Sequence, residues 1–217
     1  MAGVLPWREN VNTVMPASAG GWNERSMVGG FIAGNPPRVD DPDKKIVKFF
    51  IDNRDAIRIG TYVFGLASVA FLWFLGSLFG RLRRAEGGSG RLSGVALTGG
   101  VVTVAINLVA TVIYGFGGLH PETAAGDFKL SSVLFGGLAF TAAVFTAGVA
   151  VVLWSKSVLP KWFGYLGEAI ALGWFVSAAS VSTENRTIAV IGFIVFFAWA
   201  VWVFLLSVML YRTPEKA

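Results

Sequence analysis

Glu168 is the residue of this sequence whose setting most suggests chemistry, because its carboxyl group interrupts an otherwise uncharged stretch, residues 162–183. In a bilayer an acidic side chain near the centre costs roughly 2.5 to 3.5 kcal/mol on insertion scales, so an interaction should offset that cost. One hypothesis is a proton or cation site, or a contact with a donor on another helix or subunit. The other is a carboxyl group that its apolar surroundings keep neutral and that bonds to a serine or a backbone carbonyl. The other uncharged stretches contain no lysine, arginine or histidine to complete a proton relay, which favours the second hypothesis and simple packing.

In the stretch 92–119, every fourth position from Gly99 holds a small or polar residue. The set comprises Gly99, Thr103, Asn107, Thr111 and Gly115. On a helix this spacing predicts one stripe that allows close approach and hydrogen bonds to a neighbouring helix. A substrate path would show the same residues, but helix packing is the more frequent cause. By helical rise Asn107 lies about 10 Å deeper than Glu168, so we do not expect the two to share a site. A second stripe has small residues only, for which packing is sufficient: Ala139, Ala143 and Ala147.

The composition removes many catalytic chemistries. The chain has Cys 0 and His 1, which excludes a disulfide framework, a thiolate nucleophile, an iron–sulfur cluster, a cysteine zinc site and a haem held by two histidines of this chain. It also lacks a Walker loop, a dinucleotide fingerprint and the HExxH and GxSxG motifs. We therefore predict that the chain is not an enzyme and has no covalent or metal cofactor. A bound lipid, quinone or carotenoid is left open, because aromatic residues crowd the last uncharged stretch: Phe193, Phe196, Phe197, Trp199, Trp202 and Phe204.

The segments that carry these residues have the composition and length of transmembrane helices. The chain is 54% hydrophobic and 14% charged, with a mean hydropathy of +0.64, whereas a soluble domain carries about a quarter charged residues. A helix needs about 20 residues to cross about 30 Å of hydrocarbon. Five stretches satisfy this length and are apolar on all faces, namely residues 59–79, 92–119, 130–155, 162–183 and 187–211. We therefore predict an all-α polytopic transmembrane helix bundle over residues 59–217, in which short connections make consecutive spans antiparallel.

The lysines and arginines predict the orientation of the bundle, because short cytoplasmic loops are rich in them. One side collects Arg81, Arg83, Arg84, Arg91, Lys156, Lys161, Arg212 and Lys216, and the other only Lys129 and Arg186. We predict an inner (plasma) membrane protein with its C-terminus in the cytoplasm and its N-terminus outside. The basic residues of segment 44–58 oppose this orientation, although aspartates are interleaved with them. Because topology explains the basic residues, the pI of 9.7 does not predict a nucleic-acid partner.

Residues 1–43 form an extended arm that is rich in Gly and Pro and shows neither helical nor strand periodicity, so it cannot form a core of its own. It nevertheless contains apolar residues that a solvated linker would normally lack, among them Trp7, Trp22 and Phe31. One prediction is a poorly ordered tail. The other is an arm that lies across a partner subunit and orders only when bound.

The pattern changes in residues 44–58, where apolar residues fall near helical spacing, as at Ile46, Phe50 and Ile57. This spacing predicts a short amphipathic helix lying in the membrane interface. An N-terminal extension of the first span would show the same pattern, and the two interpretations are equally supported.

Two stretches carry a family resemblance. They are LWFLGSLFGRLRRAEGGSGRLS, which begins at Leu72, and LPKWFGYLG, which begins at Leu159. They resemble small uncharacterised polytopic membrane proteins of bacteria, particularly actinobacteria, over residues 45–180. The resemblance implies a membrane topology and no activity. The long N-terminal arm and Glu168 depart from the pattern of that group.

Together these features predict an accessory or scaffolding subunit of a larger membrane-protein complex, which would contact membrane lipids and other membrane-protein subunits. The arm and the small-residue helix faces would make the protein contacts. One alternative is a small oligomeric transporter or channel that uses Glu168 and the Asn107 stripe. Another is a subunit that holds a lipid-soluble cofactor, either a quinone or a carotenoid.

Overall fold

The computed structural model describes residues 37–181 and 186–213, and within them every regular element is a helix. In chain order these are α2 (Asp43–Asp52), α3 (Arg54–Glu86), α4 (Arg91–Leu119), α5 (Ala124–Ser155), α6 (Lys161–Ala178), the 3-10 helix η2 (Ala179–Val181) and α7 (Arg186–Arg212). Five segments are long and apolar enough to cross a membrane: Arg54–Glu86, Arg91–Leu119, Ala124–Ser155, Lys161–Val181 and Val190–Arg212. The predicted all-α bundle with five candidate transmembrane helices is confirmed.

Several residues named above lie outside the described part of the chain. They are residues 1–36 of the arm, with Trp7, Trp22 and Phe31, and Lys216 near the C-terminus.

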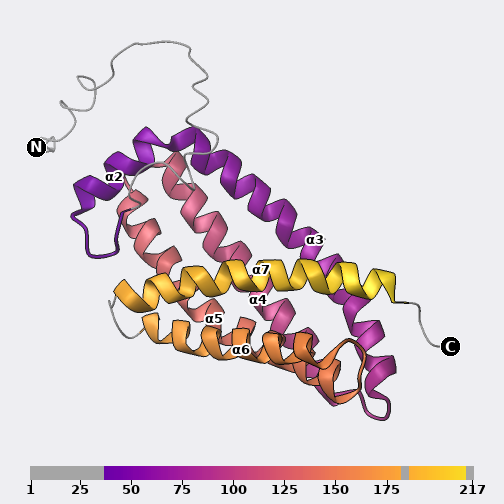
Figure 1. The fold of residues 1–217 in the computed structure, drawn as a ribbon. Coiled ribbons are helices and arrows are strands. Elements are labelled where there is room, and N and C mark those ends of the chain that lie inside the picture. The colour runs from indigo at the N-terminus through magenta and orange to yellow at the C-terminus, as the bar shows by residue number, and fades with distance from the viewer. Residues whose placement is uncertain (1–36, 182–185, 214–217) are drawn as a thin grey trace, which may run out of the picture. The chain divides into compact units, whose positions relative to one another are not determined.

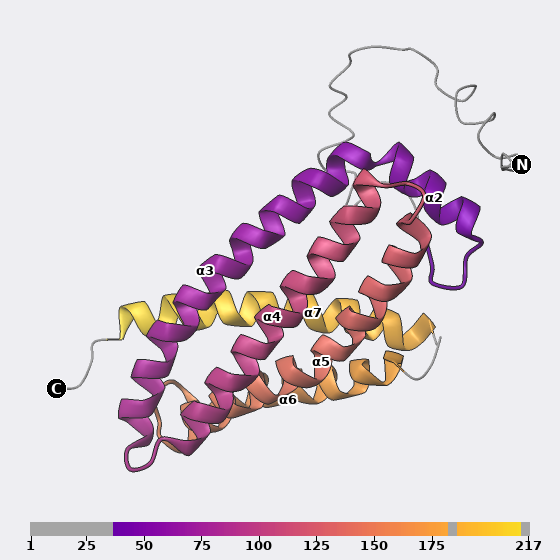
Figure 2. The same cartoon turned by 180° about the vertical axis from the view of Figure 1, so that it is seen from behind.

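α5 is the central helix of the bundle. α4 and α6 pack directly on α5, whereas α3 packs mainly on α4 and α7 mainly on α6. Of the apolar window of α5, 61% is buried, compared with 17% for α3 and 22% for α7. Consecutive spans run in opposite directions (Figures 1 and 2). The outer helices also meet at one end, where the Arg81 guanidinium of α3 donates a hydrogen bond to the Leu210 carbonyl of α7.

Small residues bring α4 and α5 close together. A Cβ atom on Gly99 of α4 would lie 2.8 Å from the Phe145 backbone nitrogen of α5, and one on Gly148 of α5 would lie 3.0 Å from Ala96 Cβ of α4. Only glycine permits this separation. The buried Phe145 ring then fills the space between α3, α5 and α7, with ring contacts to Phe71 at 5.5 Å and to Trp199 at 6.1 Å.

α2 packs its apolar face on the end of the bundle. Ile46 and Phe50 are fully buried in a cluster with Ile57 and Ala124, and the Phe50 ring lies 5.0 Å from that of Tyr114. The helix is interrupted at Asn53, whose side-chain nitrogen donates to the Phe49 carbonyl at 2.9 Å. α3 starts at the next residue. Segment 44–58 is thus divided between a separate helix and the first turn of α3. Ile46 and Phe50 on the apolar side of α2 face protein, whereas Ile51 is exposed, and the interfacial position of this helix stays a prediction.

The connection between α3 and α4 is held by Glu86. Its carboxylate accepts hydrogen bonds from the Leu92 backbone N–H at 2.9 Å, the Ser93 backbone N–H at 2.8 Å and the Ser93 hydroxyl at 2.6 Å. These are amides of the first turn of α4, which have no partner within the helix. Gly90, which precedes α4, has a φ of 63° and offers no side chain for this purpose, so the carboxylate of the preceding helix acts as the cap.

Candidate functional sites in the membrane spans

Glu168 lies half-buried on α6 and pairs with an indole of α5. Its Oε1 atom accepts a hydrogen bond of 2.6 Å from Trp154 Nε1. The Trp154 ring also lies 5.8 Å from the Tyr165 ring, with an interplanar angle of 30°. In the structure Glu168 thus accepts a hydrogen bond from a donor on another helix, as the first hypothesis included. Within the described residues its side chain bonds neither to a serine nor to a backbone carbonyl, which are the partners that the second hypothesis named.

The turn between α5 and α6 explains how this pair forms. Ser157 adopts a left-handed conformation with a φ of 53°, and α6 begins at Lys161 after Pro160. A Cβ atom on Gly164 would lie 2.8 Å from Trp154 Cβ, so only glycine lets the two helices approach closely enough. Trp154 is the second-last residue of the uncharged stretch 130–155, and the sequence gives no signal that its indole reaches Glu168.

The chemistry available to this pair is limited. An indole N–H is a donor only and does not titrate in the physiological range, so it can neither pass a proton to Glu168 nor receive one. A hydrogen bond from a donor to a carboxylate offsets part of the cost of placing that carboxylate in an apolar setting. The contact therefore joins α5 to α6. It gives the Trp154 N–H an acceptor and the Glu168 carboxyl group a donor.

Asn107 on α4 bonds to α3. Its side-chain nitrogen donates to the Ser68 hydroxyl at 3.0 Å, and that hydroxyl donates to the Phe64 carbonyl at 2.9 Å. Ser68 is buried. This contact belongs to a different pair of helices from the Glu168 contact, which agrees with the expectation that the two residues do not share a site.

Thr103 on the same helix faces α5 instead. Its hydroxyl lies 2.9 Å from the Thr141 hydroxyl and 2.8 Å from the Gly99 carbonyl, and Thr141 donates to the Leu138 carbonyl at 3.0 Å. Thr141 was not among the predicted contact residues, although it is a polar residue in an alanine-rich run. The paired hydroxyls hold α4 to α5.

The stripe from Gly99 to Gly115 is consequently not one face, and this expectation was wrong. At about 100° per residue, sixteen residues turn about 160° beyond four full rotations. Gly99 therefore contacts α5, while a Cβ atom on Gly115 would lie 2.7 Å from the Thr61 side chain of α3. Thr111, between them, is buried. The small and polar residues are used for packing within this chain, as are the buried Ala139 and Ala143, and Ala147 is half-buried.

The aromatic residues of α7 divide into an inner and an outer group. Trp202 is buried, stacks on Phe163 of α6 at 5.5 Å and donates to the Phe163 carbonyl at 3.1 Å. The Trp199 ring lies 6.1 Å from the Trp174 ring of α6, and among the described residues neither buried indole nitrogen has a hydrogen-bond partner. The outer group consists of Phe193, Phe197 and Phe204, which are exposed, whereas Phe196 is half-buried.

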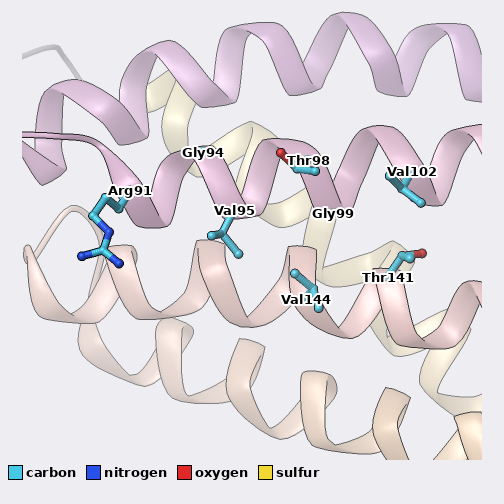
Figure 3. Close-up of a pocket in the computed structure, with 8 residues that line it drawn as sticks. All are labelled: Arg91, Gly94, Val95, Thr98, Gly99, Val102, Thr141 and Val144. Carbon is cyan, nitrogen blue, oxygen red and sulfur yellow. The ribbon is translucent and has the colours of Figure 1, made fainter.

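A groove of about 560 Å³ runs along the contact between α4 and α5 (Figure 3). Val95 and Val102 of α4 and Val144 of α5 form its apolar walls, and Arg91 lies at one end. Gly94 opens the groove, because a Cβ atom there would meet nothing within 4 Å. The groove was not predicted from the sequence, since it depends on the distance between two helices.

Among the residues that the structure describes, no group of three or more His, Cys, Asp or Glu side chains could hold a metal ion. Comparisons of the chain with models of known protein families, with curated proteins and with solved structures found no match. The resemblance to small actinobacterial membrane proteins therefore stays a prediction.

Proposed function

We propose that the chain is an accessory or scaffolding subunit that binds other membrane proteins within the bilayer. The observation that carries this proposal is the outward face of α3. We define the α3 outer face as the exposed residues Leu66, Val69, Ala70, Trp73, Gly76 and Ser77. At about 100° per residue, all six fall within a third of the helix circumference.

Trp73 distinguishes this face from an ordinary lipid-facing surface. Its side chain is 79% exposed, and within the described residues its indole N–H has no acceptor. Trp73 lies six residues before Phe79, the last residue of the uncharged stretch, which places it about 9 Å inside the hydrocarbon by helical rise. Tryptophans that only anchor a helix lie at the membrane surface, where water satisfies the N–H. Protein mutational data give a cost of about 1 to 3 kcal/mol for an unpaired buried polar group, and transfer to pure hydrocarbon costs more.

A transmembrane helix of another protein would remove that cost. Ala70, Gly76 and Ser77 flank Trp73 and are small enough for a second backbone to approach closely, as at many helix contacts in membranes. A Cβ atom on Gly76 would meet nothing within 4 Å, so the space beside it is open. A hydroxyl or carbonyl of the partner helix could then accept the Trp73 N–H. Tryptophan is also over-represented among residues that dominate binding energy at protein interfaces.

The polar residues inside the spans favour this role over a transport path. Glu168 bonds to α5, Asn107 to α3 and Thr103 to α5, so the three join different helix pairs and do not converge. Each is used to hold this chain together. The proposal therefore gives these residues a structural role and places recognition on the outer surface and on the arm, including Trp7, Trp22 and Phe31.

The proposal includes the inner (plasma) membrane as location, with the C-terminus in the cytoplasm. Two of the basic residues that oppose this orientation, and one near the start of α5, form ion pairs with aspartates among residues 41–52. Lys45 and Lys48 lie 2.8 Å from Asp41 and Asp52, and Lys129 lies 2.8 Å from Asp43. The hydrogen bond from Lys45, with a second from the Arg38 backbone N–H, holds the pKa of Asp41 below its usual value.

Site-specific photo-crosslinking in native membranes tests the proposal. A photoreactive phenylalanine analogue at position 73 should attach to a protein helix in a discrete product. The matched control is position 204 on α7, where Phe204 is 66% exposed but has no polar atom, and which should attach to lipid. Trp73→Ala should release the crosslinked partner from gently extracted complexes, and Phe204→Ala should not.

The proposal is overturned if position 73 attaches only to lipid, or if the partner stays bound in fixed ratio after Trp73→Ala. Deleting residues 1–43 separates the two contact surfaces, because loss of the arm should weaken the complex without removing the crosslink at position 73. A crosslink to a second copy of this chain would show that the partner is the chain itself, and the assembly would then be a homo-oligomer and not a hetero-complex.

A further inference from the structure

The groove between α4 and α5 has the chemistry of a hydrocarbon site. Val95 and Val102 of α4 and Val144 of α5 line it (Figure 3). The Thr141 hydroxyl, which also lies on the groove, is already bonded to Thr103 and to the Leu138 carbonyl. The walls therefore offer contact to an apolar chain and few free groups to a polar ligand.

The length of the groove matches one leaflet of a bilayer. From Arg91 to Val102 the helix rises eleven residues, or about 16 Å at 1.5 Å per residue. Half of a hydrocarbon core of about 30 Å is about 15 Å. Arg91 precedes the uncharged stretch that starts at Leu92, so it lies at the membrane surface and Val102 lies near the bilayer centre.

Arg91 supplies charge at the surface end. Its side chain extends from α4 toward α5 at the end of the groove (Figure 3), and within the described residues it forms no ion pair. A guanidinium group binds a phosphate through paired hydrogen bonds. Basic pockets between transmembrane helices on the cytoplasmic side bind anionic headgroups, and this is the end of the bundle that carries Arg83, Arg84 and Lys156.

From these observations we propose that the groove is a binding site for one anionic phospholipid, whose acyl chain lies between Val95, Val102 and Val144 and whose phosphate contacts Arg91. This proposal needs the five spans to cross a membrane, draws on the proposed cytoplasmic location of the Arg91 end, and does not depend on the scaffold role. It also differs from general lipid contact, because it names one place, one leaflet and one headgroup charge.

Native mass spectrometry of the full chain tests it. The protein is reconstituted in vesicles of equal parts phosphatidylglycerol and phosphatidylcholine, extracted gently, and analysed for retained lipid. The wild-type chain should keep one phosphatidylglycerol in preference to phosphatidylcholine. Gly94→Leu, whose Cβ atom would meet nothing within 4 Å and whose longer side chain would occupy the groove, should reduce retention about tenfold. Arg91→Gln should keep a lipid but lose the preference for phosphatidylglycerol.

Two control variants make the result specific. Gly60→Leu introduces the same side chain on α3, where a Cβ atom also meets nothing within 4 Å, and should leave retention unchanged. Lys161→Gln removes a positive charge at the start of α6, away from the groove, and should leave the headgroup preference unchanged. Equal retention by Gly94→Leu and Gly60→Leu would overturn the proposal. So would a dimer that Gly94→Leu abolishes, because the groove would then hold a second copy of the chain.

Discussion

Replacing Gly99 with alanine tests whether α4 and α5 are held at the separation that the structure shows. The added Cβ atom would lie 2.8 Å from the Phe145 backbone nitrogen and 3.2 Å from the Phe145 Cα and the Thr141 carbonyl oxygen. Ordinary contacts of a Cβ atom start at 3.4 Å, so the helices must separate by about 0.6 Å. Because backbone atoms form the obstacle, no side-chain rotation can relieve it.

The expected cost follows from this geometry. Overpacking of a well-packed core costs about 1 to 3 kcal/mol. Alanine is also a better helix former than glycine, by up to about 1 kcal/mol, which offsets part of the cost. Gly94→Ala on the same helix gains the same propensity and meets nothing within 4 Å, so the difference between the two variants isolates the packing term. We expect Gly99→Ala to be less stable than Gly94→Ala by about 1 to 3 kcal/mol.

The assay is unfolding of the purified full chain in mixed micelles with increasing sodium dodecyl sulfate, followed by circular dichroism. Both variants are compared with the wild-type chain under the same conditions. Equal unfolding midpoints for Gly99→Ala and Gly94→Ala would refute the close contact between α4 and α5, and with it the origin of the groove beside them.

Two further substitutions test the hydrogen bonds that join the helices. Trp154→Phe removes the donor to Glu168 and should destabilise the chain by about 1 kcal/mol in the same unfolding assay. Glu168→Gln keeps an acceptor oxygen and should destabilise the chain less. An equal or larger destabilisation by Glu168→Gln would contradict the assigned hydrogen bond. Glu86→Ala should expose the Leu92 and Ser93 amides and speed their hydrogen exchange, since loss of a cap costs about 1 kcal/mol, and unchanged exchange would mean that the carboxylate is not the cap of α4.

The fold could be predicted because a helix that crosses the hydrocarbon core must be apolar over about 20 residues. The stretches without charge identify the five spans, but they mark only the part of each helix that lies in lipid. α3 begins at Arg54 and not at residue 59, and it continues to Glu86, beyond residue 79, because charged residues extend a helix into the polar surroundings. The position of α2 was open for a different reason. Amphipathic spacing shows that a helix has an apolar side, but not whether lipid or protein covers it.

The contacts inside the bundle were less predictable than the spans. The four-residue repeat from Gly99 to Gly115 suggested one stripe, yet a helix has 3.6 residues per turn, so the repeat winds from α5 to α3. The Glu168 partner could not be found from spacing, because Trp154 reaches it across a helix hairpin. Tertiary geometry decides both cases.

Exposure alone does not tell which neighbour a membrane-embedded surface has, but the polar atoms on it do. Phe204 of α7 is exposed and has no polar atom, so lipid chains satisfy it completely. Trp73 is exposed about 9 Å inside the hydrocarbon and carries an N–H that lipid chains cannot pair, so its surface favours a protein. The groove of α4 and α5 is lined mainly by apolar groups, with the hydroxyls of Thr98 and Thr141 beside them, and it ends in a guanidinium group at the membrane surface, so it favours an anionic lipid. The neighbours proposed for the three surfaces thus follow from one physical criterion, namely which polar groups each surface exposes to the membrane, and the crosslinking and lipid-retention experiments test them separately.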